Sequence, residues 1–202
     1  GVHAVQHEVE HRVGHDHGDD HGHRKGGLEN QNKKIALVIA VLALCLAFSE
    51  TLGKSAQTNA LSLNIEAGNL WAFFQAKNVR RTVVLTAAEE MAVTAPAAPE
   101  LIKAAVTKQI DTWQKTAARY RSEPEVQEGT VELAERAKAA EKKRDTALAK
   151  YHHYEVASAA FQIGIVLASA TVITGMVLLT WVAMGLGGIG LLFMAIGLFA
   201  PH

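Results

Sequence analysis

Residues 156–200 read VASAAFQIGIVLASATVITGMVLLTWVAMGLGGIGLLFMAIGLFA and contain no Lys, Arg, Asp or Glu. A helix needs about 20 mostly apolar residues to cross a bilayer, so this run is long enough for two spans. Thr174 and Gly175 form the best turn, because a break there leaves a full span on each side. The stretch therefore predicts a transmembrane helical hairpin that enters and leaves on one face of the membrane.

Small residues recur in both predicted spans of the hairpin. Small side chains let neighbouring membrane helices approach closely. We therefore expect helix contacts at Gly164, Ala168, Ser169, Ala170, Gly187, Gly190 and Gly197.

A second apolar run, residues 35–48, follows Lys33 and Lys34. With its flanks up to Gly53 it reaches spanning length, and it lacks the A-x-A cleavage site of a signal peptide. A retained transmembrane helix over residues 33–53 is the favoured interpretation, and a removed signal peptide is the alternative. The single cysteine, Cys45, lies in this run, where we expect a buried and unreactive thiol.

Residues 54–154 consist mostly of good helix formers, with prolines at 96, 99 and 124 that separate three helical segments. Apolar residues in the first segment alternate in steps of four and three, the spacing of one helix face packed on another, and a further seam follows in each of the other two segments. These seams are rich in alanine, which predicts an antiparallel, coiled-coil-like stalk that associates with a neighbouring copy. The first seam is Ala56, Ala60, Leu63, Ala67, Leu70 and Phe74.

The expected fold is therefore all-α, with three transmembrane helices and an extramembrane helical stalk. The chain divides into a His-rich tail (residues 1–32), a first span (33–53), the helical domain (54–154) and the hairpin (155–202). The segment 15–23 mixes histidine with aspartate and glycine, which is typical of a loop.

The N-terminal tail is the first candidate metal site. Neutral imidazole is a usual protein ligand of Zn, Ni and Cu, so a histidine-rich tail can capture a divalent metal as a cofactor. The alternative is a solvated tail that binds metal only incidentally. The candidate ligands are His3, His7, His11, His15, His17, His21 and His23.

A second candidate site depends on the packing of the spans. If the first span and the first helix of the hairpin are antiparallel neighbours, Glu50 lies near His152, His153 and Glu155. Carboxylate and imidazole groups in a helix bundle form metal or proton-relay sites. The alternative interpretation is an interfacial belt of Tyr and His side chains, with Glu50 paired to a base.

Residues 64–80, NIEAGNLWAFFQAKNVR, are the most distinctive soluble stretch. They resemble the I-E-A-S-D-x-W-A-Y-Y-Q-A-K-S-I-R core of DUF4337, a bacterial family of unknown function. The order of parts is also similar, including FQIGIVLAS at residues 161–169, although residues 68–70 depart from the Ser-Asp pair of the family. The resemblance implies an architecture and no activity. It singles out Glu66, Trp71, Phe74, Gln75 and Lys77, for which helix packing is favoured over a ligand or partner site.

Charge bears on topology and on partners. The basic residues before the first span place the tail in the cytoplasm, whereas those before the hairpin favour the reverse. The charges before the first span count for more in setting the orientation, because a long loop can be translocated despite its charge. The net charge is zero and no basic stripe surrounds Arg80 and Arg81, so we expect no nucleic-acid partner.

No phosphate-binding loop, nucleophile elbow or H-E-x-x-H motif is present, so we do not expect an enzyme. The leading hypothesis is a scaffold protein of the bacterial inner membrane that self-associates within the lipid bilayer and contacts other membrane proteins. A metal-handling membrane protein is one alternative. The other is an oligomeric channel or transporter component, with Glu50, Thr171, Thr174 and Thr180 as its candidate polar groups.

Overall fold

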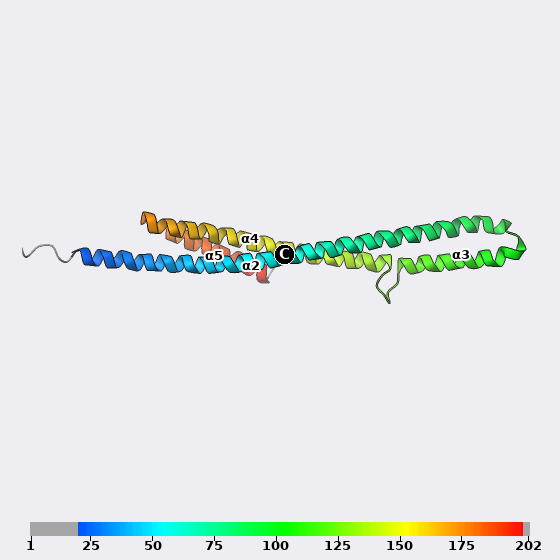
Figure 1. Ribbon diagram of the computed structural model, residues 1–202, viewed down its shortest axis with the longest axis horizontal. Coiled ribbons are helices and arrows are strands. Elements are labelled where there is room, and N and C mark those ends of the chain that lie inside the picture. Colours follow the sequence, from blue (N-terminus) through cyan, green and yellow to red (C-terminus); the bar gives the residue numbers. More distant parts are fainter. Residues whose placement is uncertain (1–19, 200–202) are drawn as a thin grey trace, which may run out of the picture. The chain divides into compact units, whose positions relative to one another are not determined.

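The computed structural model describes the backbone of residues 20–199 and the side chains of residues 32–199. This part of the chain consists of helices and short connections, without a strand, which confirms the all-α prediction (Figure 1). The elements are α2 (Asp20–Thr94), the 3-10 helix η1 (Ala95–Ala97), α3 (Glu100–Arg121), α4 (Thr130–Thr174) and α5 (Val177–Phe199).

The helix ends confirm the predicted breaks. Proline lacks the amide hydrogen that a helix interior requires, and Pro96 and Pro99 lie between α2 and α3, while Pro124 lies between α3 and α4. The hairpin turns at Gly175, whose φ of 72° lies in the left-handed region that glycine adopts without steric cost. Within the described residues, three helices are long and apolar enough to cross a membrane.

The N-terminal boundary of α2 differs from the sequence expectation. Segment 15–23 was expected to be a loop, but α2 begins at Asp20 and includes His21 and His23. The helix also continues through Gly53, where the first predicted span ends. A Cβ at Gly53 would lie 3.5 Å from Tyr154 Cβ, so this residue packs as an ordinary helix contact.

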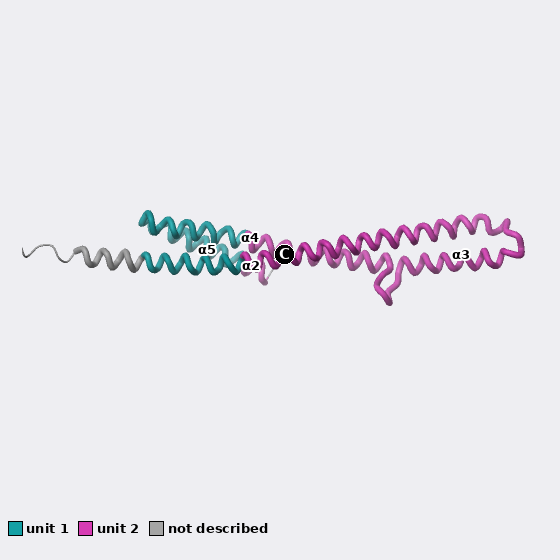
Figure 2. The backbone as a smooth tube through the Cα atoms, in the orientation of Figure 1, with its two compact units in different colours: residues 1–49, 156–193 teal, residues 50–155, 194–202 magenta. Residues whose placement is uncertain are grey.

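The structure divides into two compact units, which have different colours in Figure 2. Unit 1 comprises residues 1–49 and 156–193, and unit 2 comprises residues 50–155 and 194–202. The helices of unit 1 meet at glycine notches. A Cβ at Gly190 would lie 2.7 Å from the buried Phe161 ring, and one at Gly187 would lie 2.7 Å from Leu42 Cδ2.

These notches confirm the expected role of small residues in the spans. Gly164, Gly187, Gly190 and Ala168 are buried in unit 1. Ser169 and Ala170 are only half-buried. In unit 2, Gly197 is also buried, as expected.

In unit 2, residues 50–94 of α2 run antiparallel to α3 and to the first part of α4. The order of contacts shows this direction, because Asn64 meets Arg144, whereas Lys77 meets Glu123. The core of the unit contains Ala67, Leu70, Leu133, Ala137 and Ala140, with Trp71 and Phe74 packed against it. The predicted first seam is therefore the packed face of α2.

Candidate functional site

The distinctive motif at residues 64–80 splits between two faces of α2. Trp71, Phe74 and Lys77 are three residues apart, so they share the face that packs on the rest of unit 2. Glu66 and Gln75 are exposed and take no part in that packing. The structure therefore brings together three of the five motif residues.

Trp71 and Phe74 are packing residues. Their rings meet edge to face with centroids 5.4 Å apart, and both flank the core cluster of unit 2. The indole Nε1 of Trp71 donates a hydrogen bond of 2.9 Å to Glu141 Oε1 on α4. This bond satisfies the one polar atom of a half-buried indole.

Lys77 is buried, and it joins three parts of unit 2. Its Nζ lies 3.3 Å from Glu123 Oε2 and 3.7 Å from Glu128 Oε2, both in the connection that follows α3. The ring of Tyr120, near the end of α3, lies 6.0 Å from the same nitrogen. We call this group, Lys77, Tyr120, Glu123 and Glu128, the Lys77 clasp.

A buried ammonium group is costly unless it is paired and hydrogen-bonded. Lys77 meets this requirement with two carboxylates, and the Phe73 ring on its own helix lies 5.6 Å from the nitrogen. All of these partners belong to the same chain. The clasp therefore ties α2 to the connection between α3 and α4.

Glu132, in the first turn of α4, bonds to the residues at the start of the connection between α3 and α4. Its carboxylate accepts a hydrogen bond of 2.5 Å from Ser122 Oγ and one of 3.3 Å from the Glu123 backbone N–H. The Ser122 bond is the main reason that the pKa of Glu132 is lowered, with smaller contributions from backbone N–H groups and from Lys77. The negative charge also lies near the positive end of the α4 dipole.

Gly129 leaves the space that Glu132 needs to bond to Ser122 and Glu123. A Cβ at this position would overlap the Glu132 carboxylate, and it would lie 2.6 Å from both Glu123 N and Ser122 Cα. Thr130 then donates a hydrogen bond of 3.2 Å to the Arg121 carbonyl oxygen. The connection is thus a fixed turn held by side chains, and the two glutamates of the clasp are held with it.

A family model described as "Domain of unknown function (DUF4337)" matches residues 31–200, which is most of the chain. The chain belongs to the DUF4337 family. No curated protein and no solved structure matches it. The match covers the helices of both units and includes the Lys77 clasp of this DUF4337 chain.

Sequence reasoning identified Lys77 of this DUF4337 protein but none of its partners. Glu123 is 46 residues away in the chain, and Ser122 and Glu132 become neighbours only when the turn forms. One signal was available, because the run 122–129 holds three glutamates beside a proline and a glycine. From the sequence, this run predicts only the break between two helical segments at Pro124.

The second candidate metal site is not assembled. Within residues 32–199 no group of three or more His, Cys, Asp or Glu side chains is placed to hold a metal ion, so Glu50, His152, His153 and Glu155 do not form such a group. His152 Nδ1 does lie 3.5 Å from Glu155 Oε2, one turn away. His153 is rotated by about 100° from His152 around the helix and contributes its Cβ to the packing at Gly197.

The tail histidines of this DUF4337 chain cannot be placed in the same way. Two of them, His21 and His23, lie in the first turn of α2, but the described side chains begin further along the chain. The other candidate ligands, His3, His7, His11, His15 and His17, lie outside the described residues.

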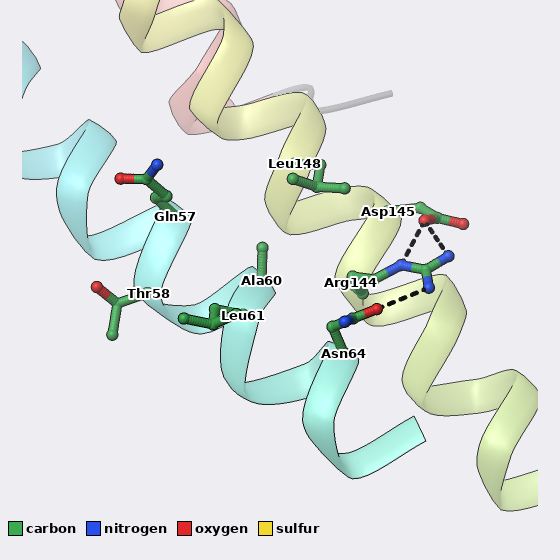
Figure 3. A pocket seen from close by; sticks show the side chains of 8 residues that line it. All are labelled: Gln57, Thr58, Ala60, Leu61, Asn64, Arg144, Asp145 and Leu148. Carbon is green, nitrogen blue, oxygen red and sulfur yellow. Dashed lines mark hydrogen bonds and ion pairs between the residues drawn. The ribbon is translucent and has the colours of Figure 1, made fainter. Parts of the chain in front are cut away.

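A groove of about 530 Å³ lies between α2 and α4 in unit 2 (Figure 3). Arg144 bridges it by donating a hydrogen bond of 3.2 Å to Asn64 Oδ1, while its Nε and Nη2 reach Asp145 Oδ1 at 3.0 and 2.9 Å. The guanidinium group is therefore engaged within the chain. The other lining residues are Gln57, Thr58, Ala60, Leu61 and Leu148.

Unit 1 holds an apolar groove of about 360 Å³ between α2 and α5. The half-buried Cys45 lines it together with Leu42, Met184 and Gly188. Elsewhere in this unit Thr180 Oγ1 donates to Thr171 Oγ1 at 3.2 Å, and Thr171 Oγ1 donates to the Leu167 carbonyl oxygen. These hydroxyls satisfy one another and the helix backbone.

Proposed function

We propose that this DUF4337 protein is a structural membrane protein that self-associates and carries a helical scaffold outside the bilayer. The observation that carries the proposal is the exposure of large aliphatic side chains on the helices of unit 2. Leu61, Ile65, Val79 and Val83 on α2 are more than half exposed, and Leu101 on α3 is 95% exposed. A soluble surface rarely leaves so many large apolar groups along one helix without a partner.

The Lys77 clasp supports a structural role. Its charges, and the hydrogen bond of Trp71 to Glu141, are used between segments of one chain. Such pairs favour one arrangement of the helices over others, because a shifted register would leave a charge buried without its partner. A scaffold needs a fixed arrangement of this kind more than it needs an open pocket.

Support for the membrane assignment comes from three helices in the described part of the chain that are long and apolar enough to span a bilayer. We place the protein in the bacterial inner membrane, with the N-terminal tail in the cytoplasm. The basic residues Arg24, Lys25, Lys33 and Lys34 before the first span support this orientation. The helical domain of residues 54–154 then lies on the opposite side.

Light scattering coupled to size exclusion tests self-association. The full chain, purified in a mild detergent, is expected to give a protein mass of at least two chains over a range of concentrations. A mass of one chain at every concentration, after subtraction of the detergent, would overturn the proposal.

The four-residue spacing of His3, His7, His11 and His15 favours a second candidate function, the collection of divalent metal. Zinc calorimetry on the intact protein and on a chain without residues 1–27 tests it. The expected result is a set of sites that only the intact chain shows. Equal zinc binding by both chains would remove the tail from any metal-handling function.

A further inference from the structure

Helix α2 carries a second apolar face in unit 2. Seven exposed residues form what we call the outer stripe, and at about 100° per residue they fall within about 80° of the helix circumference. The packed seam lies on the opposite side of the helix. The outer stripe consists of Leu61, Ile65, Gly68, Ala72, Ala76, Val79 and Val83.

The spacing of the outer stripe is regular. Its members follow one another in steps of four, three and four residues, and this eleven-residue unit occurs twice between Leu61 and Val83. An eleven-residue repeat corresponds to about 3.67 residues per turn, so the stripe stays in line along an almost straight helix. At about 1.5 Å per residue it extends about 33 Å. This is the surface that another helix covers lengthwise.

The side chains of the outer stripe are large at its two ends and small in the middle. Gly68, Ala72 and Ala76 recur every four residues between the larger aliphatic residues. Small residues at this spacing let two helices approach closely, with backbone Cα–H groups near carbonyl oxygens.

Among the described residues, nothing near Gly68 requires a glycine at this position. A Cβ at this position would meet no atom within 4 Å. Glycine inside a helix is nevertheless less favourable than alanine by about 1 kcal/mol. Close approach of a second helix gives a physical reason for a glycine here.

The rim of the outer stripe is uncharged from Leu61 to Val79, and the exposed Arg80 lies beside its last turn. Between Lys54 and Arg80 the charged residues are Glu66 and Lys77. Lys77 is buried in its clasp, and Glu66 lies about 120° around the helix from the centre of the stripe. The residues beside the stripe include Ser62, Asn64, Asn69, Gln75 and Thr82.

The neutral rim indicates what covers the stripe. A polyanion or a charged peptide would require opposite charges at the rim. In a parallel pair of identical helices each rim residue lies near its own counterpart, so any charge would meet a like charge and repel it. A rim that is neutral from Leu61 to Val79 is therefore suited to a second copy of the same chain.

We infer that the outer stripe is a parallel two-fold interface with a second copy of this protein, in which each stripe residue faces its counterpart. The inference rests on the proposed self-association and names its surface. In each of two copies anchored in one membrane, the outer stripe follows the first span along α2 in the same direction. This common direction favours parallel pairing. Anchoring of both copies in one bilayer raises their effective concentration, which favours association through a narrow surface.

Disulfide cross-linking in native membranes tests the register. In a full-length Cys45→Ser background, Ile65→Cys and Val79→Cys are each expected to form dimers with a mild oxidant. Glu66→Cys, exposed on the same helix but about 120° around it from the centre of the outer stripe, is the control and is expected to cross-link at least tenfold less. An antiparallel pair would join residue 65 to residue 79 of the other copy, so neither single cysteine would react.

Light scattering of Gly68→Leu and Glu66→Gln separates association from folding. Gly68→Leu is expected to raise thermal stability slightly through helix propensity and to weaken self-association at least tenfold, while Glu66→Gln, away from the stripe, leaves association unchanged. If the unmodified chain is an oligomer and Gly68→Leu associates equally well, or if Glu66→Cys cross-links as strongly as Ile65→Cys, the interface lies elsewhere and this inference is wrong. A monomeric unmodified chain would overturn the proposed function as well.

Discussion

Two lysines of unit 2 make ion pairs in opposite surroundings. Lys77 is buried and bonds to Glu123 at 3.3 Å, whereas Lys115 is largely exposed and pairs with Asp111 at 2.7 Å on α3. Lys77→Met keeps the apolar stem but removes the charged hydrogen bond. We expect the free energy of unfolding, measured with denaturant in detergent micelles, to fall by about 1–3 kcal/mol.

Lys115→Met is the matched control. An exposed pair one turn apart contributes about 0.3–0.5 kcal/mol, because water and salt screen it. Equal losses for the two variants would show that the Lys77 clasp contributes no more than a surface pair.

Glu132 makes part of the stability of unit 2 dependent on pH. The hydrogen bond from Ser122 lowers the pKa of this carboxyl below the value of about 4.3 that glutamate has in an unfolded chain. The folded state therefore binds fewer protons, so the stabilisation is complete above that value and is lost as pH falls through the lower folded pKa. We expect the melting temperature in a non-ionic detergent to drop as the pH is lowered past 4.

Ser122→Ala removes the main cause of the lowered pKa and serves as the comparison. Its melting temperature at neutral pH is expected to be lower than that of the unmodified chain, and the two are expected to converge in acid. Parallel pH profiles with a constant offset would contradict the assignment of the acid sensitivity to Glu132.

Between helices, the closest approach in unit 1 can be tested at two glycines of α5. A Cβ at Gly190 would lie 2.7 Å from the Phe161 ring, whereas a Cβ at Gly188 would meet nothing within 4 Å. Both changes to alanine alter the backbone equally, so their difference reports packing. Gly190→Ala is expected to cost about 1–3 kcal/mol through overpacking, seen as a lower melting temperature, and Gly188→Ala is expected to cost nothing.

A second substitution checks the cause of that loss. Phe161→Leu removes the ring that the new methyl group would strike, so it should cost less in the Gly190→Ala background than in the unmodified chain. Additive losses would mean that the two positions do not contact each other.

The periodic features of the elements were predictable. The first seam predicted the buried Ala67 and Leu70, and the run without charge predicted the hairpin with its turn at Gly175. Both follow from repeating local rules about helix faces and proline or glycine breaks. The continuity of α2 through Gly53 was missed, because one glycine lowers helix propensity without ending a helix.

The candidate site was less predictable than the fold. Contacts of Lys77 with Glu123 join residues far apart in the chain, and no periodicity encodes a charge pair of that kind. The outer stripe of α2 was also missed, since apolar residues on two opposite faces weaken the one-sided pattern by which a packed helix is identified. Three-dimensional placement was needed to separate Leu61 and Val83 from the seam behind them.

For the whole molecule, the decisive prediction concerns the side of the membrane. The first span should separate the N-terminal tail from residues 54–154. In a Cys45→Ser chain, Glu125→Cys in the exposed turn after α3 is expected to react with an impermeant maleimide on intact cells. Ala4→Cys in the tail is expected to react only after the membrane is permeabilised.

Each other labelling pattern has a definite meaning. The reverse pattern would place the tail outside and the helical domain in the cytoplasm. Labelling of both cysteines on intact cells would show that residues 33–53 do not cross the membrane, which would contradict the three-span arrangement itself.

Opposite faces of α2 in unit 2 repeat with different periods. The seam, from Ala56 to Phe74, repeats every seven residues, and the outer stripe repeats every eleven. A seven-residue repeat makes helices coil around one another to the left, and an eleven-residue repeat makes them coil to the right. An assembly that buried both faces would apply opposing torques to one helix, which would then remain straight. The distance that this helix extends from the membrane would then depend only on its number of residues, at about 1.5 Å per residue.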